Sequence, residues 1–309
     1  MRQQGTGAWR GLLHAGSCRA WTLPADATCA AVARQVFRDS VSEVGLVPGL
    51  LDDCILMASE LAANTLHARA VAGAGGGGDQ LVSVAQDMGG ELIPSASPPP
   101  RPSALPELWL YLRGLGIRRE LVCKVFDSCR GWRHGSVPSA SLVSAQAVAG
   151  RGLQIVHELS RGRWGHHPTR ARLGGRRGGK AVWFAVPAPL AHARLVDVTG
   201  LRAYTLSADV SAARANARLS ARQAAMQLEA MLTDRGVADD LVRADKPACD
   251  TSVLSVCRDL TVWCREGVVS LTTPESSERW NYADLVEAAE LTVQRYEELE
   301  LAAGLAIAQ

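Results

Sequence analysis

The sequence lacks the features of several large classes of protein. It has no run of about 18 consecutive apolar residues, the length that spans a membrane, and residues 1–16 contain no continuous apolar stretch like that of a signal peptide. None of its eight cysteines forms a C-x-x-C pair, which argues against a zinc site or a disulfide framework. The formal net charge is only +2, so no basic excess indicates nucleic-acid binding. We therefore expect a cytoplasmic protein without a membrane or nucleic-acid partner.

The chain contains enough apolar residues for two folded units. Hydrophobic residues make up 47% of 309 positions, and at about 150 residues per domain this length predicts two domains. We place the boundary near residue 190, with a first domain over 1–190 and a smaller α+β module over 191–309. Residues 71–106 are rich in glycine and proline and predict a flexible insertion. Residues 132–149 predict a mobile, lid-like loop.

A glutamate and an asparagine, Glu60 and Asn64, stand four residues apart and therefore share one face of a predicted helix. That helix is predicted to begin near Pro48, with apolar residues at 51, 55, 58 and 62 on its opposite side. Carboxylate and amide oxygens one turn apart can hold a magnesium ion. Such pairs occur by chance in most helical proteins, so this pair taken alone favours a solvated helix face over a magnesium site.

An aspartate, Asp127, follows directly after the apolar run 120–126, which has the length and composition of a strand. A carboxylate in this place can accept a hydrogen bond from an exocyclic amino group. Adenine has such a group, whereas guanine presents a carbonyl at the equivalent position. The alternative is that Asp127 caps a turn with Ser128.

Two glycines, Gly150 and Gly152, precede residues 153–159, whose apolar positions have helical spacing. Free backbone N–H groups at the start of a helix attract phosphate oxygens, and the helix dipole adds to this attraction. A single G-x-G is more often only a turn. The order and spacing of three such signals along one chain favour a nucleotide site.

With these residues in this order, residues 17–187 resemble the ATP-binding domain shared by histidine kinases, Hsp90, gyrase B and MutL, called the GHKL domain. Within that superfamily the chain is most similar to the anti-sigma-factor serine kinases. The resemblance implies a Bergerat-type fold, an α+β two-layer sandwich in which helices cover one face of a mixed sheet. It rests on the N-box, the G1 box and the G2 box, which are matched by Glu60 and Asn64, by Asp127 and Gly131, and by Gly150, Arg151, Gly152 and Leu153.

The resemblance implies a site for ATP and Mg²⁺. In it, Glu60 would polarise an attacking hydroxyl, Asn64 would coordinate the magnesium ion that bridges the phosphates, and Asp127 would recognise adenine. The implied function is that of an ATP-binding regulatory protein which phosphorylates a protein partner on serine or threonine. The alternative is a non-catalytic nucleotide-binding or protein-interaction scaffold, and a homodimer is an open question.

Two positions depart from the family pattern. The G1 box usually has a glycine where this chain has Cys129. The closing strand, 178–184, commonly carries a threonine that assists the adenine-binding aspartate, and we assign Ala181 to that position. The missing hydrogen bond is worth about 0.5 to 1.5 kcal/mol.

The C-terminal module shows no catalytic arrangement of residues, so we expect a regulatory or partner-binding role for it. The acidic residues Glu297, Glu298 and Glu300 are interpreted as a solvated helix face. The basic run 161–177 is interpreted as solvated surface or a contact with a partner. The predicted elements are a helix over 208–233, strands over 252–256, 260–264 and 268–272, and a helix over 282–301.

Overall fold

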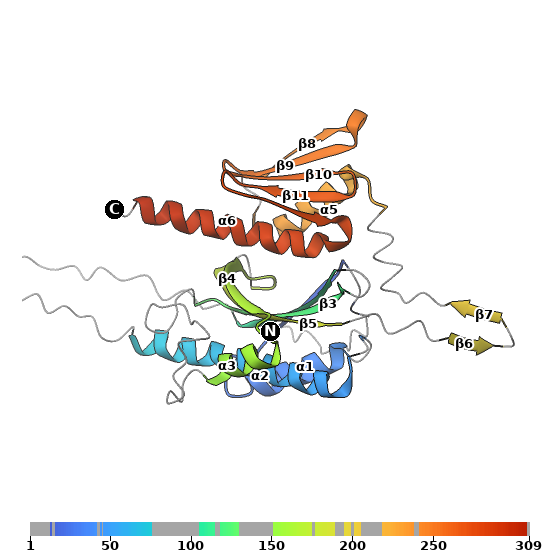
Figure 1. Ribbon diagram of the computed structural model, residues 1–309. Coiled ribbons are helices and arrows are strands. Elements are labelled where there is room, and N and C mark those ends of the chain that lie inside the picture. Colours follow the sequence, from blue (N-terminus) through green and yellow to red (C-terminus); the bar gives the residue numbers. More distant parts are fainter. Residues whose placement is uncertain are drawn as a thin grey trace, which may run out of the picture.

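Two five-stranded antiparallel sheets organise the part of the chain that the computed structural model describes (Figure 1). This confirms the α+β class predicted from the sequence. Every strand pairing in the first sheet is antiparallel, so it is not the mixed sheet that was expected. The described residues are 13, 16–41, 44, 46–75, 105–114, 118–129, 151–174, 177–188, 195–198, 201–204, 218–237 and 241–307.

Three helices cover one face of the first sheet (Figure 1). Their buried side chains and the inward side chains of the strands form one core, in which the rings of Phe37 and Phe184 lie 6.4 Å apart. The strands, in spatial order, are β1 (Cys18–Thr22), β2 (Glu107–Arg113), β3 (Glu120–Asp127), β5 (Gly178–Pro187) and β4 (Trp164–Arg170), and the helices are α1 (Cys29–Val41), α2 (Pro48–Gly75) and α3 (Arg151–Leu159).

The helices and strands predicted around residues 48, 120–126, 153–159 and 178–184 are present as α2, β3, α3 and β5, with one correction at α2. This helix continues to Gly75, so residues 71–75 are helical rather than the start of a flexible insertion. Alanine at 70, 72 and 74 explains the difference, because alanine has the highest helix propensity of all residues. Residues 76–104 of the predicted insertion and the predicted loop 132–149 lie outside the described residues.

The second sheet belongs to the C-terminal module and packs on two helices. A separate two-stranded ribbon precedes it in the chain, formed by β6 (Leu195–Val198) and β7 (Leu201–Tyr204). The strands of the second sheet, in spatial order, are β12 (Ser277–Asn281), β11 (Val268–Thr272), β10 (Leu260–Arg265), β9 (Thr251–Cys257) and β8 (Val242–Lys246), and the helices are α5 (Ala221–Asp234) and α6 (Leu285–Ile307).

The sequence predicted the three central strands of this sheet but missed both edge strands, β8 and β12. Their burial alternates between exposed and half-buried, and their sequences VRADK and SERWN are mostly polar. Charged edge strands of this kind lack the apolar pattern on which strand prediction depends. Helix α5 begins at Ala221, where Ser220 and Gln223 form a capping box. Residues 208–217 of the predicted helix lie outside the described residues.

Helix α6 lies between the two sheets, so the second face of the first sheet is covered by the C-terminal module (Figure 1). Val286 of α6 packs with Tyr111, Val122 and Ala185 of the first sheet. The two units therefore share a buried interface, and helices cover the first sheet on both faces rather than on one.

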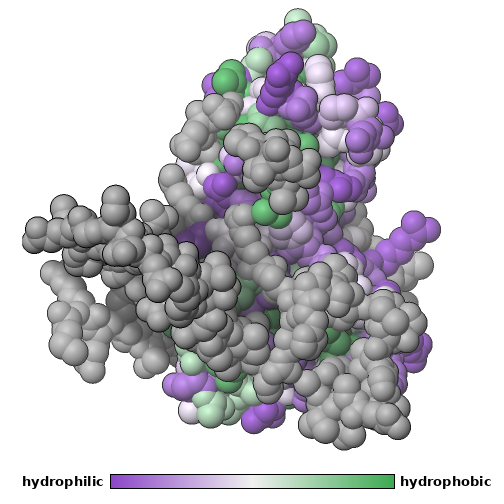
Figure 2. Space-filling model, turned by 90° about the vertical axis from the view of Figure 1, so that its left-hand side faces the viewer, coloured by the Kyte–Doolittle hydropathy of each residue, from purple (hydrophilic) through white to green (hydrophobic). Residues whose placement is uncertain are grey.

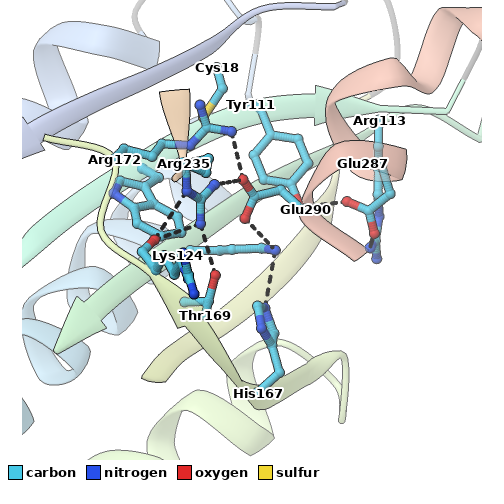
Figure 3. A network of polar contacts seen from close by, with 12 residues as sticks. Cys18, Tyr111, Arg113, Lys124, His167, Thr169, Arg172, Arg235, Glu287 and Glu290 are labelled. Carbon is cyan, nitrogen blue, oxygen red and sulfur yellow. Dashed lines mark hydrogen bonds and ion pairs between the residues drawn. The ribbon is translucent and has the colours of Figure 1, made fainter. Parts of the chain in front are cut away.

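A carboxylate of α6, Glu290, lies at the centre of this interface and is fully buried (Figure 3). It forms ion pairs with Arg172 at 2.6 Å, with Lys124 at 3.3 Å and with Arg235. The guanidinium of Arg235 also lies 4.6 Å from the centre of the Trp109 ring. Burial raises the pKa of Glu290, but the three cations outweigh it and hold the pKa well below its ordinary value.

Two further ion pairs extend the interface. Arg170 Nε lies 2.5 Å from an oxygen of Glu297, and Glu287 accepts a hydrogen bond from Tyr111 at 2.5 Å and one from Arg113 at 2.8 Å. Glu297 is fully buried, so its assignment to a solvated helix face was wrong. Its pairing residue, Arg170, comes from the basic run that we interpreted as solvated surface or a partner contact, and the contact is made with the chain's own C-terminal module.

His167 completes the network on the side of Lys124 (Figure 3). Its Nε2 lies 3.2 Å from the Lys124 ammonium, which can only donate, so Nε2 accepts and the proton sits on Nδ1. Nδ1 in turn donates to the carbonyl of Pro168 at 3.0 Å. Burial and the neighbouring Lys124 charge lower the pKa of His167 to about 3, so the ring is neutral.

None of the described helices is both long enough and apolar enough to cross a membrane. On the face of the molecule drawn in Figure 2, the described surface of the C-terminal module is mainly hydrophilic, with isolated hydrophobic residues. Such scattered apolar residues are ordinary on protein surfaces and do not mark a docking site.

Replacing Glu290 by alanine is expected to lower the free energy of unfolding by about 3–5 kcal/mol, because three cations then stay buried without their common partner. Urea denaturation followed by circular dichroism measures this loss. The matched control is Glu275→Ala, at an exposed turn position, which should leave the unfolding free energy nearly unchanged. A loss in Glu290→Ala no larger than that of the control would contradict the central role of this carboxylate.

Acidification should weaken the fold through His167. Its folded pKa lies below the ordinary value of 6.5, so the unfolded chain binds the proton first. The contribution of the neutral His167 ring to the free energy of unfolding is therefore complete above about pH 6.5, and it decreases as the pH falls. Between pH 7.5 and 5.5 the wild-type protein should lose about 1 kcal/mol more unfolding free energy than His167→Gln. Equal losses in urea denaturation at the two pH values would contradict this assignment.

Candidate functional site

The start of helix α3 lies against the polar side of α2, and this brings three predicted residues together. A Cβ atom added to Gly152 would lie 2.8 Å from Oε2 of Glu60 and 3.5 Å from Nδ2 of Asn64. Any side chain at position 152 would thus enter the space beside both polar groups. A glycine at this point keeps the space open and leaves the backbone of the helix start accessible to it.

The chemistry of this junction fits the phosphate end of a magnesium nucleotide. Glu60 and Asn64 are both half-buried and supply a carboxylate and an amide oxygen, the hard ligands that Mg²⁺ prefers. The first turn of α3 contributes the positive end of a helix dipole. The described residues contain no cluster of three or more His, Cys, Asp or Glu side chains suited to a metal ion.

The structure describes the other residues of the predicted G1 and G2 boxes to different extents. Leu153 is half-buried and packs against the core of the first unit, which gives it a structural role. Arg151 begins α3, and only its backbone is described. Gly131 and Gly150, predicted to line the site, lie outside the described residues.

Asp127 ends strand β3, and its side chain lies on the face of the sheet that α1–α3 cover. Side chains alternate along a strand, and Val125 and Cys123, two and four residues earlier, both belong to the core beneath α1–α3. Asp127 is 3% exposed. The predicted base-binding carboxylate therefore faces the same layer as Glu60 and Asn64 but is almost fully buried.

Lys180 of strand β5 lies directly across from Asp127. Its ammonium is 3.1 Å from Oδ2 of Asp127 and 2.5 Å from the backbone oxygen of Cys129. Ala181 pairs with Phe126 and joins a cluster on the opposite face of the sheet. The assignment of Ala181 to the position beside the aspartate was therefore wrong by one residue, and a lysine occupies that place.

Both oxygens of Asp127 accept hydrogen bonds. Oδ2 accepts from Lys180, and Oδ1 accepts from the backbone N–H of Cys129 at 3.0 Å. The second bond is that of an aspartate closing a turn, the alternative that the sequence left open. Cys129 does not adopt a positive φ, so the backbone accepts a cysteine here without the strain that would require glycine.

A glycine beside Lys180 permits the close approach of the two strands. A Cβ atom on Gly179 would lie 2.3 Å from the backbone oxygen of Asp127 and 2.6 Å from the ring of Phe126. The Phe126 ring is itself fixed by stacking on Trp109, with ring centres 5.8 Å apart. The absence of a side chain at 179 thus sets the distance at which Lys180 reaches Asp127.

Lys180 is the site residue that sequence reasoning missed. A signal was present, because the chain contains only three lysines and this one stands in an apolar strand next to two glycines. Lys180 and Lys124 are both buried in ion pairs.

The candidate site thus consists of two separate groups of residues. The junction of Glu60, Asn64 and Gly152 fits Mg²⁺ and phosphates, whereas the Asp127 carboxylate is already paired with Lys180. Neither a scan against protein-family models nor a search of the curated proteins finds a match for this chain.

Replacing Gly179 by alanine is expected to lower the free energy of unfolding by about 1–3 kcal/mol. The new methyl group would press against the backbone of Asp127 and the fixed ring of Phe126. The matched control is Gly49→Ala near the start of α2, where an added Cβ meets no heavy atom within 4 Å. This control should be neutral or slightly stabilising. Chemical denaturation of the two variants measures the difference, and equal stabilities would refute the close approach of β5 to Asp127.

Proposed function

We propose that this protein binds a magnesium nucleotide, ATP in the first instance, and acts as a regulatory protein on a protein partner. The observation that carries the proposal is the contact of Gly152 with Glu60 and Asn64, which lie 92 and 88 positions earlier in the sequence. Three residue types suited to phosphate and Mg²⁺ converge at the start of one helix.

In this proposal the residues have separate tasks. Asn64 would supply an oxygen ligand for Mg²⁺, the first turn of α3 would receive the phosphates, and Glu60 would accept the proton of a partner hydroxyl as its oxygen takes the γ-phosphoryl group and ADP leaves. The remaining chemistry of phosphoryl transfer depends on position and charge rather than on covalent steps through the protein. A cytoplasmic location and a protein partner belong to the same proposal, because the resemblance is to intracellular regulators of transcription.

In this proposal the C-terminal module covers one face of the first sheet. Glu290, Glu287 and Glu297 of α6 fix that module to the face opposite the nucleotide junction. A partner would therefore approach from the helix side or contact the C-terminal module, since α6 occupies the second face of the sheet.

The test is calorimetric titration of the protein with ATP, with and without Mg²⁺. We expect magnesium-dependent binding that falls at least tenfold in Asn64→Ala, the effect of about 1.4 kcal/mol. The matched control is Asn281→Ala, an exposed residue of β12, which should bind as the wild type does. Absence of binding in the wild-type protein up to millimolar ATP, or equal affinity in Asn64→Ala, would refute the proposal.

A second candidate is a nucleotide-binding or protein-interaction scaffold without turnover. The observation that favours it is the ion pair between Asp127 and Lys180, which engages the carboxylate expected to contact the base. Incubation with radiolabelled ATP and purified partner candidates separates the two. In the catalytic case, Glu60→Ala loses phosphate transfer but keeps ATP binding. Binding by the wild type with no labelled partner favours the scaffold.

A further inference from the structure

A partly open cavity of about 240 Å³ lies where the end of β2 and the start of β3 meet β12 and the start of α6. Its volume is below the roughly 300–1,000 Å³ of sites for larger ligands, so it suits a small molecule. Both units contribute to the lining, and small-molecule sites are frequent at such junctions. The first unit supplies Arg113, Gly114, Arg118 and Glu120, and the C-terminal module supplies Trp280, Asp284 and Glu287.

Most charges around this cavity neutralise one another. Arg113 lies across from Glu120 in the strand register, and its Nε is 2.9 Å from a Glu120 oxygen. A second nitrogen of Arg113 donates to Glu287 at 2.8 Å (Figure 3). The other oxygen of Glu120 accepts a hydrogen bond from Arg163 at 2.6 Å. Two carboxylates and two guanidinium groups are therefore balanced.

One carboxylate and one guanidinium group remain. Oδ1 of Asp284 accepts a hydrogen bond from the backbone N–H of Gly114 at 2.7 Å. Gly114 has a φ of +74°, and a Cβ atom there would lie 2.5 Å from the backbone oxygen of Arg118, so this bend requires glycine. Within the described part of the chain, neither Oδ2 of Asp284 nor the Arg118 guanidinium has a partner. Burial raises the pKa of Asp284, and a cation beside its free oxygen would oppose that effect.

We propose that this cavity binds a small zwitterion of the α-amino-acid class. The ligand carboxylate pairs with Arg118, the ligand ammonium pairs with the free oxygen of Asp284, and the ligand side chain packs against the indole of Trp280. A ligand with only a negative charge would meet more carboxylates than guanidinium groups in the lining. A ligand with only a positive charge would leave Arg118 unpaired.

This inference goes beyond the proposed nucleotide site and does not depend on it. The cavity lies between the first sheet and the C-terminal module, on the face opposite α1–α3. Because residues of both units line it, a bound ligand would link the two units. Ligand binding should therefore stabilise the folded protein.

The first measurement is thermal unfolding of the full-length protein with each standard L-amino acid in turn. We expect at least one amino acid to raise the midpoint of unfolding, because a ligand that binds only the folded state stabilises it. The amino acid with the largest shift is then titrated by calorimetry beside its decarboxylated amine and its deaminated acid. Each analogue lacks one charge and should bind at least tenfold more weakly.

Two variants remove the unpaired charges of the protein. Asp284→Asn keeps an oxygen that can accept the backbone hydrogen bond, and Arg118→Gln changes an exposed side chain, so the second variant should fold if the first does not. Each should weaken binding at least tenfold. The matched controls are Asp259→Asn at an exposed turn and Arg279→Gln, which lies on the side of β12 away from Trp280. Both controls should bind as the wild type does.

The comparison of analogues tests the assigned contacts directly. In Arg118→Gln the amino acid and its amine should bind with equal affinity, because the group that distinguishes them is gone. No midpoint shift with any amino acid overturns the proposal. Unchanged affinity in folded Arg118→Gln also overturns it, because the ligand would then bind elsewhere. None of these results bears on ATP binding, which Asn64→Ala tests separately.

Discussion

The arrangement of the two units depends on Glu290, a fully buried carboxylate shared by Arg172, Arg235 and Lys124. Three cations from different parts of the chain cannot be buried near one another unless an anion lies between them, and α6 supplies it. The position of α6 between the sheets follows from this requirement. Apolar packing by Val286 against the first sheet also stabilises this interface, but unlike the ion pairs it does not require a particular orientation of the side chains.

The same physical rule governs the candidate site on the other face of the sheet. Asp127 is buried, and a buried carboxylate needs donors, which Lys180 and the Cys129 backbone provide. The chain has thus satisfied this carboxylate with its own donors. Glu60, Asn64 and Gly152 at the start of α3 are half-buried rather than fully buried.

Sequence reasoning succeeded where the signal was local. The helix that carries Glu60 and Asn64 and the strand that ends at Asp127 were predicted from apolar periodicity within single segments. It failed for Arg170 and Glu297, which are far apart in the chain and pair in the interface. Charged residues are usually exposed, so a charged run predicts surface unless its distant partner is known. The register of β5 was missed for a similar reason, since one residue decides which side chain faces Asp127.

The sequence by itself determined the α+β class, the main elements of both sheets and the residue types suited to a nucleotide. Only the tertiary structure decided that Gly152 meets Glu60, that Lys180 rather than Ala181 faces Asp127, and that the C-terminal module covers the first sheet. The physical reason is the range of the interactions. Propensity and periodicity act over a few residues, whereas the pairing of buried charges joins residues tens to more than a hundred positions apart, and it appears only when the chain has folded.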